Sequence, residues 1–328
     1  MSLRIGVLGA SRIAEQAIVG PAQELGHRLV AVAARDPQRA KAFADKYGVE
    51  RVVASYQDVI SDPEVDVVYN PLANSLHAPW NLAAVAAGKP VLSEKPYARD
   101  RTEAARVAAA ADAAGVTVME GFHYLFHPLM RRVLDLAGDG SLGELRRIHV
   151  TMGMPEPPPD DPRWSLPMAG GALMDLGCYA LHIMRRFGSP RVVSATAVQR
   201  TAGVDERFTA EFAYPGVGAG LVGTHLVGSM TNSMVDDEHS FTLTVTGSRA
   251  EVLVHNFINP ARDDRLTITA ENGSTVEHLG TRPTYTYQLE AFAAHVVDGA
   301  ALPLDSADAV DNMALIDDTY RAAGMDPR

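Results

Sequence analysis

Residues 1–121 alternate short apolar runs with helix-forming stretches, and this alternation limits the possible fold more than any other feature of the chain. The expected strands are residues 4–8, 28–34, 65–69, 90–92 and 117–120, and the expected helices are 37–47, 78–87 and 102–114. A glycine follows each helix, at the position where a left-handed residue ends it. Strand–helix–strand repeats build a parallel sheet with helices on both faces. We therefore expect a doubly wound α/β domain.

The pattern changes after Gly121. Residues 127–137 and 171–187 have helical patterning, and residues 287–323 return to it. The expected strands are residues 145–154, 192–199, 208–214, 218–227, 241–246, 250–256, 265–269 and 275–279. They follow one another through turn signals without helices, which favours an antiparallel sheet. We expect an α+β domain with an open, mainly antiparallel sheet over residues 122–328, whose helix at about 306–323 could pack back on the first domain.

Composition excludes several classes of protein. At 328 residues the chain is long enough for two domains, and 47% hydrophobic residues can supply a core for each. The 40 acidic residues against 29 Lys and Arg give a net charge of −11, which disfavours nucleic acid as a partner. Cys178 is the single cysteine, and no secretory signal or long apolar run is visible. We expect a cytoplasmic protein without a membrane segment.

The first strand leads into a turn typical of dinucleotide-binding domains. Against the G-x-G-x-x-G/A pattern, the chain offers Gly9, Ser11 and Ala14, with serine in place of the middle glycine. Arg12 and Ile13 complete the turn. The start of the following helix would present free N–H groups to a pyrophosphate. The alternative is an ordinary strand-to-helix turn.

The end of the second strand bears on the choice between NAD and NADP. An acidic residue there binds the ribose of NAD, whereas an arginine accommodates the 2′-phosphate of NADP. The chain reads Ala34-Arg35-Asp36-Pro37, and Asp36 before proline is the usual N-cap of a helix. We interpret Asp36 as a cap and Arg35 as a phosphate-binding residue. The expected cofactor is NADP, with NAD as the alternative.

Two distant segments carry side chains suited to redox chemistry at a carbon–oxygen bond. Lys95 follows the fourth strand in the run Ser-Glu-Lys-Pro, and residues 170–179 read Gly-Gly-Ala-Leu-Met-Asp-Leu-Gly-Cys-Tyr. If the second run is helical, Asp175, Tyr179 and His182 share one face. The substrate oxygen must gain or lose a proton while its carbon exchanges a hydride. A lysine and a tyrosine that meet in one cleft could manage that proton.

These residues resemble the glucose-fructose oxidoreductase/inositol dehydrogenase (Gfo/Idh/MocA) family over essentially the whole chain. The likeness rests on the N-terminal turn, residues 70–77, 94–96, 121–128 and 141–145, Arg163-Trp164, and residues 170–182 and 287–293. The resemblance implies a Rossmann domain, then a domain with an open antiparallel sheet whose exposed face often forms the oligomer interface, here of a homodimer or homotetramer. It also implies that Lys95 lies beside the nicotinamide and that the Lys95–Pro96 bond can be cis.

The remaining candidates extend the two sites. Tyrosine stands where many family members carry histidine, and an adjacent ammonium lowers the pKa of a phenol from about 10 toward the range of a useful base. Asp175 would orient the lysine or a substrate hydroxyl, the alternative being a pair with an arginine. Further cofactor-binding candidates are Leu72, Asn74, His77, Glu94 and Trp164, and further substrate-binding candidates are Tyr124, Arg163 and His182.

His123 and His127 have the spacing of a zinc pair but lack a third ligand, so we expect no metal. The sequence predicts an NAD(P)-dependent oxidoreductase that acts on a secondary alcohol or ketone of a sugar, a sugar derivative or a cyclic diol. Lys95, Asp175 and Tyr179 are the predicted catalytic residues. The alternatives are a nucleotide-sugar ketoreductase, with Arg163 at the phosphates, and a cofactor-binding sensor without turnover.

Overall fold

The computed structural model describes residues 2–215 and 226–328, and the chain divides into two compact units. Unit 1 comprises residues 1–122 and 285–313, and unit 2 comprises residues 123–284 and 314–328. The sequence predicted a domain boundary after residue 121. The second unit is not continuous, because residues 285–313 belong to unit 1. Thr286, for example, donates a hydrogen bond to Glu24 (3.1 Å).

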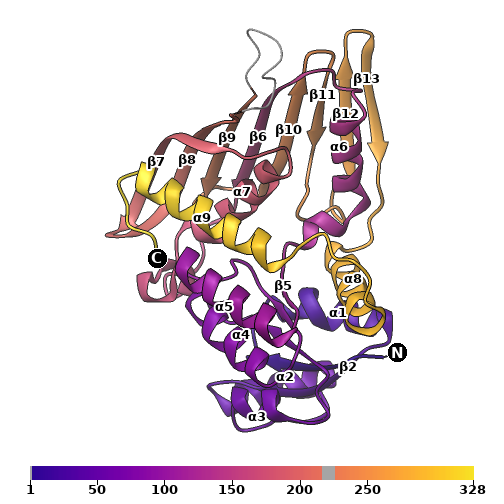
Figure 1. The fold of residues 1–328 in the computed structure, drawn as a ribbon, viewed down its shortest axis with the longest axis vertical. Helices are drawn as coiled ribbons and strands as arrows, with labels where there is room; N and C mark the ends of the chain where they lie inside the picture. The colour runs from indigo at the N-terminus through magenta and orange to yellow at the C-terminus, as the bar shows by residue number, and fades with distance from the viewer. Residues whose placement is uncertain (1, 216–225) are drawn as a thin grey trace. The chain divides into compact units, whose positions relative to one another are not determined.

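Unit 1 is built on a five-stranded sheet in the order β2-β1-β3-β4-β5, in which every strand pair is parallel. Its strands are β1 (Arg4–Leu8), β2 (Arg28–Ala33), β3 (Val67–Asn70), β4 (Val91–Ser93) and β5 (Val118–Glu120). Its helices include α1 (Gly20–Leu25), α2 (Pro37–Tyr47), α3 (Tyr56–Ser61), α4 (His77–Ala86) and α5 (Arg101–Ala114) (Figure 1). The predicted doubly wound domain is confirmed.

Helix α2 shows how local sequence sets the element bounds. The Asp36 side chain accepts a hydrogen bond from the Gln38 N–H (2.9 Å), and Pro37 occupies the first helical position. Gly48 ends the helix in the left-handed conformation, at φ +71°. These are the preferred residues at each end of a helix. The capping role predicted for Asp36 is confirmed.

Unit 2 contains an eight-stranded sheet in the order β13-β12-β11-β10-β6-β9-β8-β7. Its strands are β6 (Leu145–Gly153), β7 (Arg191–Thr201), β8 (Val204–Ala213), β9 (Val227–Ser233), β10 (Ser240–Gly247), β11 (Ala250–Val254), β12 (Arg265–Ala270) and β13 (Gly273–His278). All neighbouring pairs are antiparallel except β6 and β9, which are parallel. The mainly antiparallel sheet was predicted, but strand β9 was missed. The predicted strand over residues 218–227 lies almost entirely outside the described residues.

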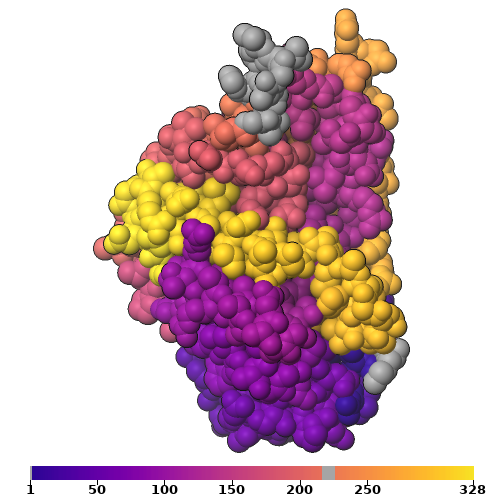
Figure 2. Space-filling view, in the orientation of Figure 1, coloured from indigo at the N-terminus to yellow at the C-terminus, as the bar shows by residue number. Residues whose placement is uncertain are grey.

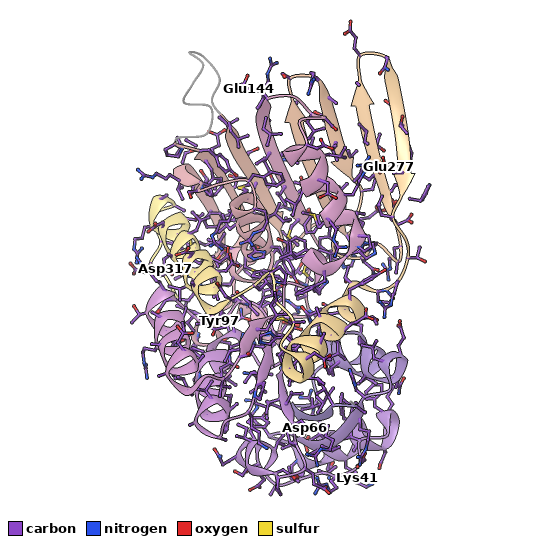
Figure 3. The ribbon with its side chains drawn as sticks, turned by 45° about the vertical axis from the view of Figure 1, so that its right-hand side comes forward. Lys41, Asp66, Tyr97, Glu144, Glu277 and Asp317 are labelled. Atoms are coloured by element: carbon purple, nitrogen blue, oxygen red, sulfur yellow. The ribbon has the colours of Figure 1, made fainter. Side chains whose placement is uncertain are left out.

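Two helices of unit 2 lie on the same face of its sheet, α6 (Pro128–Gly138) and α7 (Cys178–Arg185) (Figure 1). Arg132 of α6 bonds to Glu277 of β13 (2.7 Å), the residue labelled beside this helix in Figure 3. A π-helical turn over residues 173–177 leads directly into α7. Phe208 and Phe212 of β8 are buried, and the Tyr214 hydroxyl, directly after β8, donates to the Met184 carbonyl of α7 (3.1 Å). The sheet core therefore anchors the helix that carries Tyr179.

Two further helices follow the sheet along the chain, α8 (Thr284–Asp298) and α9 (Ser306–Ala322). By the division into units, all of α8 after Thr284 belongs to unit 1, whereas α9 begins in unit 1 and ends in unit 2. Figure 2 shows the last residues of the chain, in yellow, against the salmon-coloured surface of unit 2. Among residues 2–215 and 226–328, no helix is both long and apolar enough to cross a membrane.

Candidate functional site

The turn after β1 has the conformation that the dinucleotide pattern requires. Gly9 adopts φ +91°, and a Cβ there would lie 2.9 Å from a methyl group of Leu72. Its N–H donates to the Ala33 carbonyl (2.7 Å), which ties the turn to β2. The Ser11 hydroxyl is buried and has no hydrogen-bond partner among the described residues. A phosphate oxygen bound at this turn would supply that partner, so the residues fit the pyrophosphate of a dinucleotide.

Arginines gather around this turn. Arg39 of α2 donates to the Ala10 carbonyl (3.0 Å) within the turn, and Arg12 belongs to the turn itself. Arg35 is exposed at the end of β2. Asp36 is occupied as the cap of α2, so it is held away from the role of ribose ligand. The local charge at the end of β2 is therefore positive, which suits an anionic group.

The segment from Leu72 to His77 is clamped to the segment that contains Lys95 by one buried side chain. The two ring nitrogens of His77 lie 2.6 Å from the Pro96 carbonyl oxygen and 2.8 Å from the Leu72 carbonyl oxygen. Burial, against the opposing effect of the two carbonyls and with a smaller contribution from the Lys95 ammonium, lowers the pKa of His77 to about 4. His77 thus acts on the predicted cofactor-binding segment through the backbone.

A buried polar network fixes the strand ends on either side of this clamp. Asn70 donates to Asn81 (2.8 Å), and Asn81 donates to the Ser93 hydroxyl (3.0 Å). The Tyr69 hydroxyl donates to Glu94 (2.9 Å). Fully satisfied networks of this kind hold backbone segments in one arrangement. Lys95 follows directly, half-buried, and the Lys95–Pro96 bond is cis as the resemblance implies.

In unit 2, the two glycines before the Tyr179 helix are required by close packing. A Cβ on Gly170 would collide with the carbonyl oxygen of Arg163. Gly171 adopts φ +125°, and a Cβ there would collide with the carboxylate of Asp205. No side chain larger than hydrogen fits at either position without moving backbone or a buried carboxylate. The Gly-Gly pair therefore marks where the chain turns tightly into the helix.

The Asp205 carboxylate is a buried anchor for the start of that helix. It accepts hydrogen bonds from the Leu173 N–H (2.7 Å), the Tyr320 hydroxyl (3.0 Å) and the Arg328 guanidinium (2.5 Å). The side chains of Arg328 and Asp205 are 1% and 0% exposed. Arg328 also donates to the Gly170 carbonyl (2.9 Å). Residues 205, 320 and 328 together hold the first turn of the helix.

Asp175 pairs with Arg163, the alternative weighed from the sequence. Arg163 Nε lies 2.7 Å from Asp175 Oδ2, and its Nη1 lies 3.2 Å from Asp161 Oδ2. The two carboxylates, Asp175 first, raise the pKa of the Arg163 guanidinium. Arg163 is therefore already paired with two carboxylates.

Tyr179 and His182 face one segment of unit 2, as their predicted common face requires. The Tyr179 hydroxyl lies 3.0 Å from His123 Nε2, and His182 Nδ1 lies 2.6 Å from the Tyr124 hydroxyl. The rings of Tyr124 and Tyr179 also pack, with centroids 6.0 Å apart. Asp175 bonds to Arg163 instead. His123 as the partner of Tyr179 was not predicted, since no spacing in the sequence connects the two residues.

Trp164 supports the Pro-rich loop that precedes it. Its indole N–H donates to the Pro157 carbonyl (3.2 Å), and the Arg200 guanidinium lies 4.4 Å from the ring centroid. One ring face is thus covered by a cation. The structure therefore gives Trp164 a structural role within unit 2, and stacking on a nicotinamide or a sugar stays a prediction.

The histidine pair considered for zinc has other partners. His123 bonds to Tyr179 and Thr284, and His127 Nδ1 accepts from the Leu129 N–H at the start of α6 (3.1 Å). In the described part of the chain, no group of three or more His, Cys, Asp or Glu side chains has the arrangement of a metal site.

Comparison with known proteins covers both units. A family model described as "Oxidoreductase family, NAD-binding Rossmann fold" matches residues 3–122, and the "GFO/IDH/MocA C-terminal domain" matches residues 130–276. The chain is 32% identical to a D-xylose 1-dehydrogenase (NADP⁺) of Haloferax volcanii, over 98% of this chain and 97% of that protein. It is 34% identical to trans-1,2-dihydrobenzene-1,2-diol dehydrogenase of Mus musculus, over 66% of each chain.

Among solved structures, a 3-ketoreductase from Actinomadura kijaniata in complex with NADP and TDP-benzene has a TM-score of 0.87. It is 28% identical, and the alignment covers 97% of this chain and 96% of that one. The same reductase has been solved with one lysine or one tyrosine replaced.

Proposed function

Because this chain belongs to the Gfo/Idh/MocA family of oxidoreductases, we propose that it transfers a hydride between NADP and a secondary alcohol or ketone of an uncharged sugar, sugar derivative or cyclic diol. The chain is an NAD(P)-dependent dehydrogenase or reductase that acts on CH–OH groups of sugars. The observation that carries the finer proposal is the pairing of Arg163 with two carboxylates.

The proposed mechanism divides the work between the two units. The turn at Gly9 and Ser11 would hold the pyrophosphate, and bound NAD(P) supplies or accepts the hydride. We assign Lys95, fixed by the His77 clamp, to donate a hydrogen bond to the substrate oxygen and to stabilise its negative charge. We assign Tyr179 to take the hydroxyl proton during oxidation and to return it during reduction. Asp175, held by Arg163, would orient a substrate hydroxyl.

The charge around Arg163 supports an uncharged substrate. A nucleoside diphosphate needs a cation with open hydrogen-bond positions. Arg163 already faces Asp175 and Asp161 at 2.7 and 3.2 Å. Bringing a diphosphate here would set it against two carboxylates, whereas a sugar hydroxyl can donate to either acid. We therefore prefer the sugar or diol to the nucleotide-sugar.

A nucleotide-sugar ketoreductase is the second candidate, and the likeness to the 3-ketoreductase solved with TDP-benzene supports it. The two candidates differ in one assay. Oxidation of free aldoses and cyclic diols with NADP⁺, followed at 340 nm, is expected to proceed, whereas reduction of dTDP-keto-deoxysugars with NADPH is expected to be slow. Turnover of dTDP-sugars alone would reverse the order of the candidates. NADPH binding without any turnover across both panels would favour the sensor.

We propose NADP over NAD because Arg35 is exposed at the end of β2, where an arginine can accommodate a 2′-phosphate, and Asp36 is used as a cap. Arg35→Ala is expected to weaken NADPH binding about tenfold, as loss of one exposed charge-assisted contact, and to leave NADH unchanged. Fluorescence titration measures both. Asp36→Ala is the matched neighbour: it should lower stability by about 1 kcal/mol without changing the NADPH/NADH ratio. Equal weakening of both cofactors by Arg35→Ala would remove the NADP assignment.

We also propose a homodimer or homotetramer formed through the open face of the eight-stranded sheet. Val198, Val227 and Val276 are 49%, 43% and 50% exposed on the face opposite the helices. Strands with apolar side chains toward solvent are candidates for association. Val227→Lys combined with Val198→Lys is expected to give a smaller species by light scattering. An unchanged mass would place the interface elsewhere.

A further inference from the structure

His123 lies behind Tyr179 with both ring nitrogens engaged by hydroxyl groups. Its Nε2 lies 3.0 Å from the Tyr179 hydroxyl, and its Nδ1 lies 2.7 Å from the Thr284 hydroxyl. The imidazole is 0% exposed, and Thr284 is 3% exposed. All three residues belong to unit 2. A buried imidazole between two hydroxyls has partners that can each give or accept a hydrogen.

The backbone sets the direction of these hydrogen bonds. The Thr284 hydroxyl donates to the Ile258 carbonyl (3.4 Å), and a carbonyl oxygen only accepts. With its proton directed at that carbonyl, Thr284 Oγ1 accepts from His123 Nδ1–H. In a neutral imidazole, the other nitrogen is then an acceptor, so Nε2 receives the Tyr179 O–H. The Tyr179 O–H proton therefore points at His123 Nε2, and the lone pairs of the Tyr179 oxygen point away from His123.

We propose that His123 is a positioning residue for Tyr179 that also relays its proton, so that a phenol serves as a base at neutral pH. The proposal rests on the function proposed above, because it requires Tyr179 to exchange a proton with the substrate. A free phenol has a pKa of about 10 and rarely loses its proton near pH 7, whereas an imidazole has a pKa of about 6.5. His123 would accept the Tyr179 proton at a pH where the phenol alone would keep it.

The step balances in both directions. During oxidation the substrate O–H bond breaks as its proton joins Tyr179 Oη, and the original Tyr179 O–H bond breaks as a proton joins His123 Nε2. The hydride leaves the substrate carbon for NAD(P)⁺, so the substrate loses two electrons and the cofactor gains them. Tyr179 ends neutral and His123 ends as an imidazolium. Reduction reverses each transfer: the Tyr179 proton passes to the substrate oxygen, and the His123 imidazolium returns its proton to Tyr179 Oη.

The groups that face this pair are themselves hydrogen-bonded. Tyr124, whose ring packs on Tyr179, bonds to His182 Nδ1 at 2.6 Å. Asp175, one turn earlier on the helix, pairs with Arg163. Both pairs belong to unit 2. Each of these groups makes a hydrogen bond or ion pair of its own, and the Tyr179 hydroxyl lies 3.0 Å from His123 Nε2.

The kinetic test replaces His123 with a residue that accepts the same hydrogen bond but takes no proton. In His123→Gln, kcat for oxidation at pH 7 is expected to fall about 10²-fold while KM changes less than about twofold. The loss should shrink as the pH approaches 10, where the phenol ionises without a relay. His255→Gln removes another histidine–threonine hydrogen bond of unit 2 (2.9 Å) and should behave as wild type. A loss of equal size at every pH would overturn the relay.

A second measurement does not depend on turnover. Long-range ¹⁵N–¹H spectra of the holoenzyme with ¹⁵N-labelled histidine report which ring nitrogen carries the proton, and the His123→Gln spectrum identifies the signal. The expected signal is that of an Nδ1–H imidazole with an unprotonated Nε2. An Nε2–H form would overturn the relay even in an active enzyme. Conversely, an Nδ1–H form in a protein inactive toward every sugar and diol would leave the relay geometry standing and refute the proposed function.

Discussion

The two units hold their proposed catalytic side chains in opposite ways. In unit 1, the segment of Lys95 is held by side chains from no more than 25 positions away, and its clamp, His77, contacts two carbonyl oxygens. In unit 2, Tyr179 is fixed by residues 123, 205, 284 and 328, and its histidine contacts two hydroxyls. Carbonyls carry no proton to give, so His77 can only hold backbone in place. The partners of a buried histidine, more than its burial, decide whether it can move a proton.

The largest effect should come from the distant anchor of unit 2. Arg328→Ala leaves the Asp205 carboxylate buried without its cation, which costs about 3–5 kcal/mol of stability. Arg321→Ala removes an exposed pair on α9 and should cost at most about 1 kcal/mol. Urea unfolding measures both. If Tyr179 depends on this anchor only for its position, the residual activity of Arg328→Ala should keep the wild-type pH profile. Equal stability of Arg328→Ala and Arg321→Ala would contradict the role of Arg328 as an anchor of Asp205.

Lys95→Ala tests the fixed charge of unit 1. Removing one preorganised donor to a developing oxyanion typically lowers kcat about 10²–10³-fold, and NADPH affinity should stay near wild type. Because a hydrogen-bond donor with a fixed charge takes no part in the proton transfer, this loss should be the same from pH 6 to pH 9. The His123→Gln loss should instead shrink as the pH rises. Similar pH profiles for Lys95→Ala and His123→Gln would contradict the assignment of a fixed charge to Lys95 and a proton relay to His123.

The smallest effect concerns the His77 clamp and the pH. Burial lowers the His77 pKa to about 4 in the folded chain, against about 6.5 when unfolded. Between these values the unfolded chain binds the extra proton, so stability is lost as the pH falls from 6.5 to 4, by at most about 3 kcal/mol. The difference between wild type and His77→Gln isolates this part of the pH dependence. A gain in relative stability on acidification would show that the imidazolium donates to both carbonyls.

The sequence could predict elements that are set by residues close together in the chain, and it could not predict those that depend on distant partners. Helix α2 was predicted with its bounds, because Asp36, Pro37 and Gly48 act within one element. Strand β9 was missed because its polar run, Val-Gly-Ser-Met-Thr-Asn-Ser, gains its place only by pairing with β6 and β8.

The candidate site divides in the same way. Lys95 and its cis bond to Pro96 lie in a short motif, and the turn at Gly9 follows from its own sequence. The histidine bonded to Tyr179 and the arginine that anchors the start of its helix come from other parts of the chain. His123 lies 56 positions before Tyr179, and Arg328 lies 123 positions after Asp205. Patterns in a single sequence do not encode which of many histidines or arginines meets a given helix.

The return of residues 285–313 to unit 1 has a consequence for how the chain can be made and divided. As the polypeptide leaves the ribosome, unit 1 stays incomplete until α8 emerges, and unit 2 waits for the second half of α9. Neither can be obtained whole from one uninterrupted gene fragment. Cutting the coding sequence after residue 122 should therefore give two insoluble products, and co-expressing the pieces should restore folding only if both halves of α9 remain on one polypeptide.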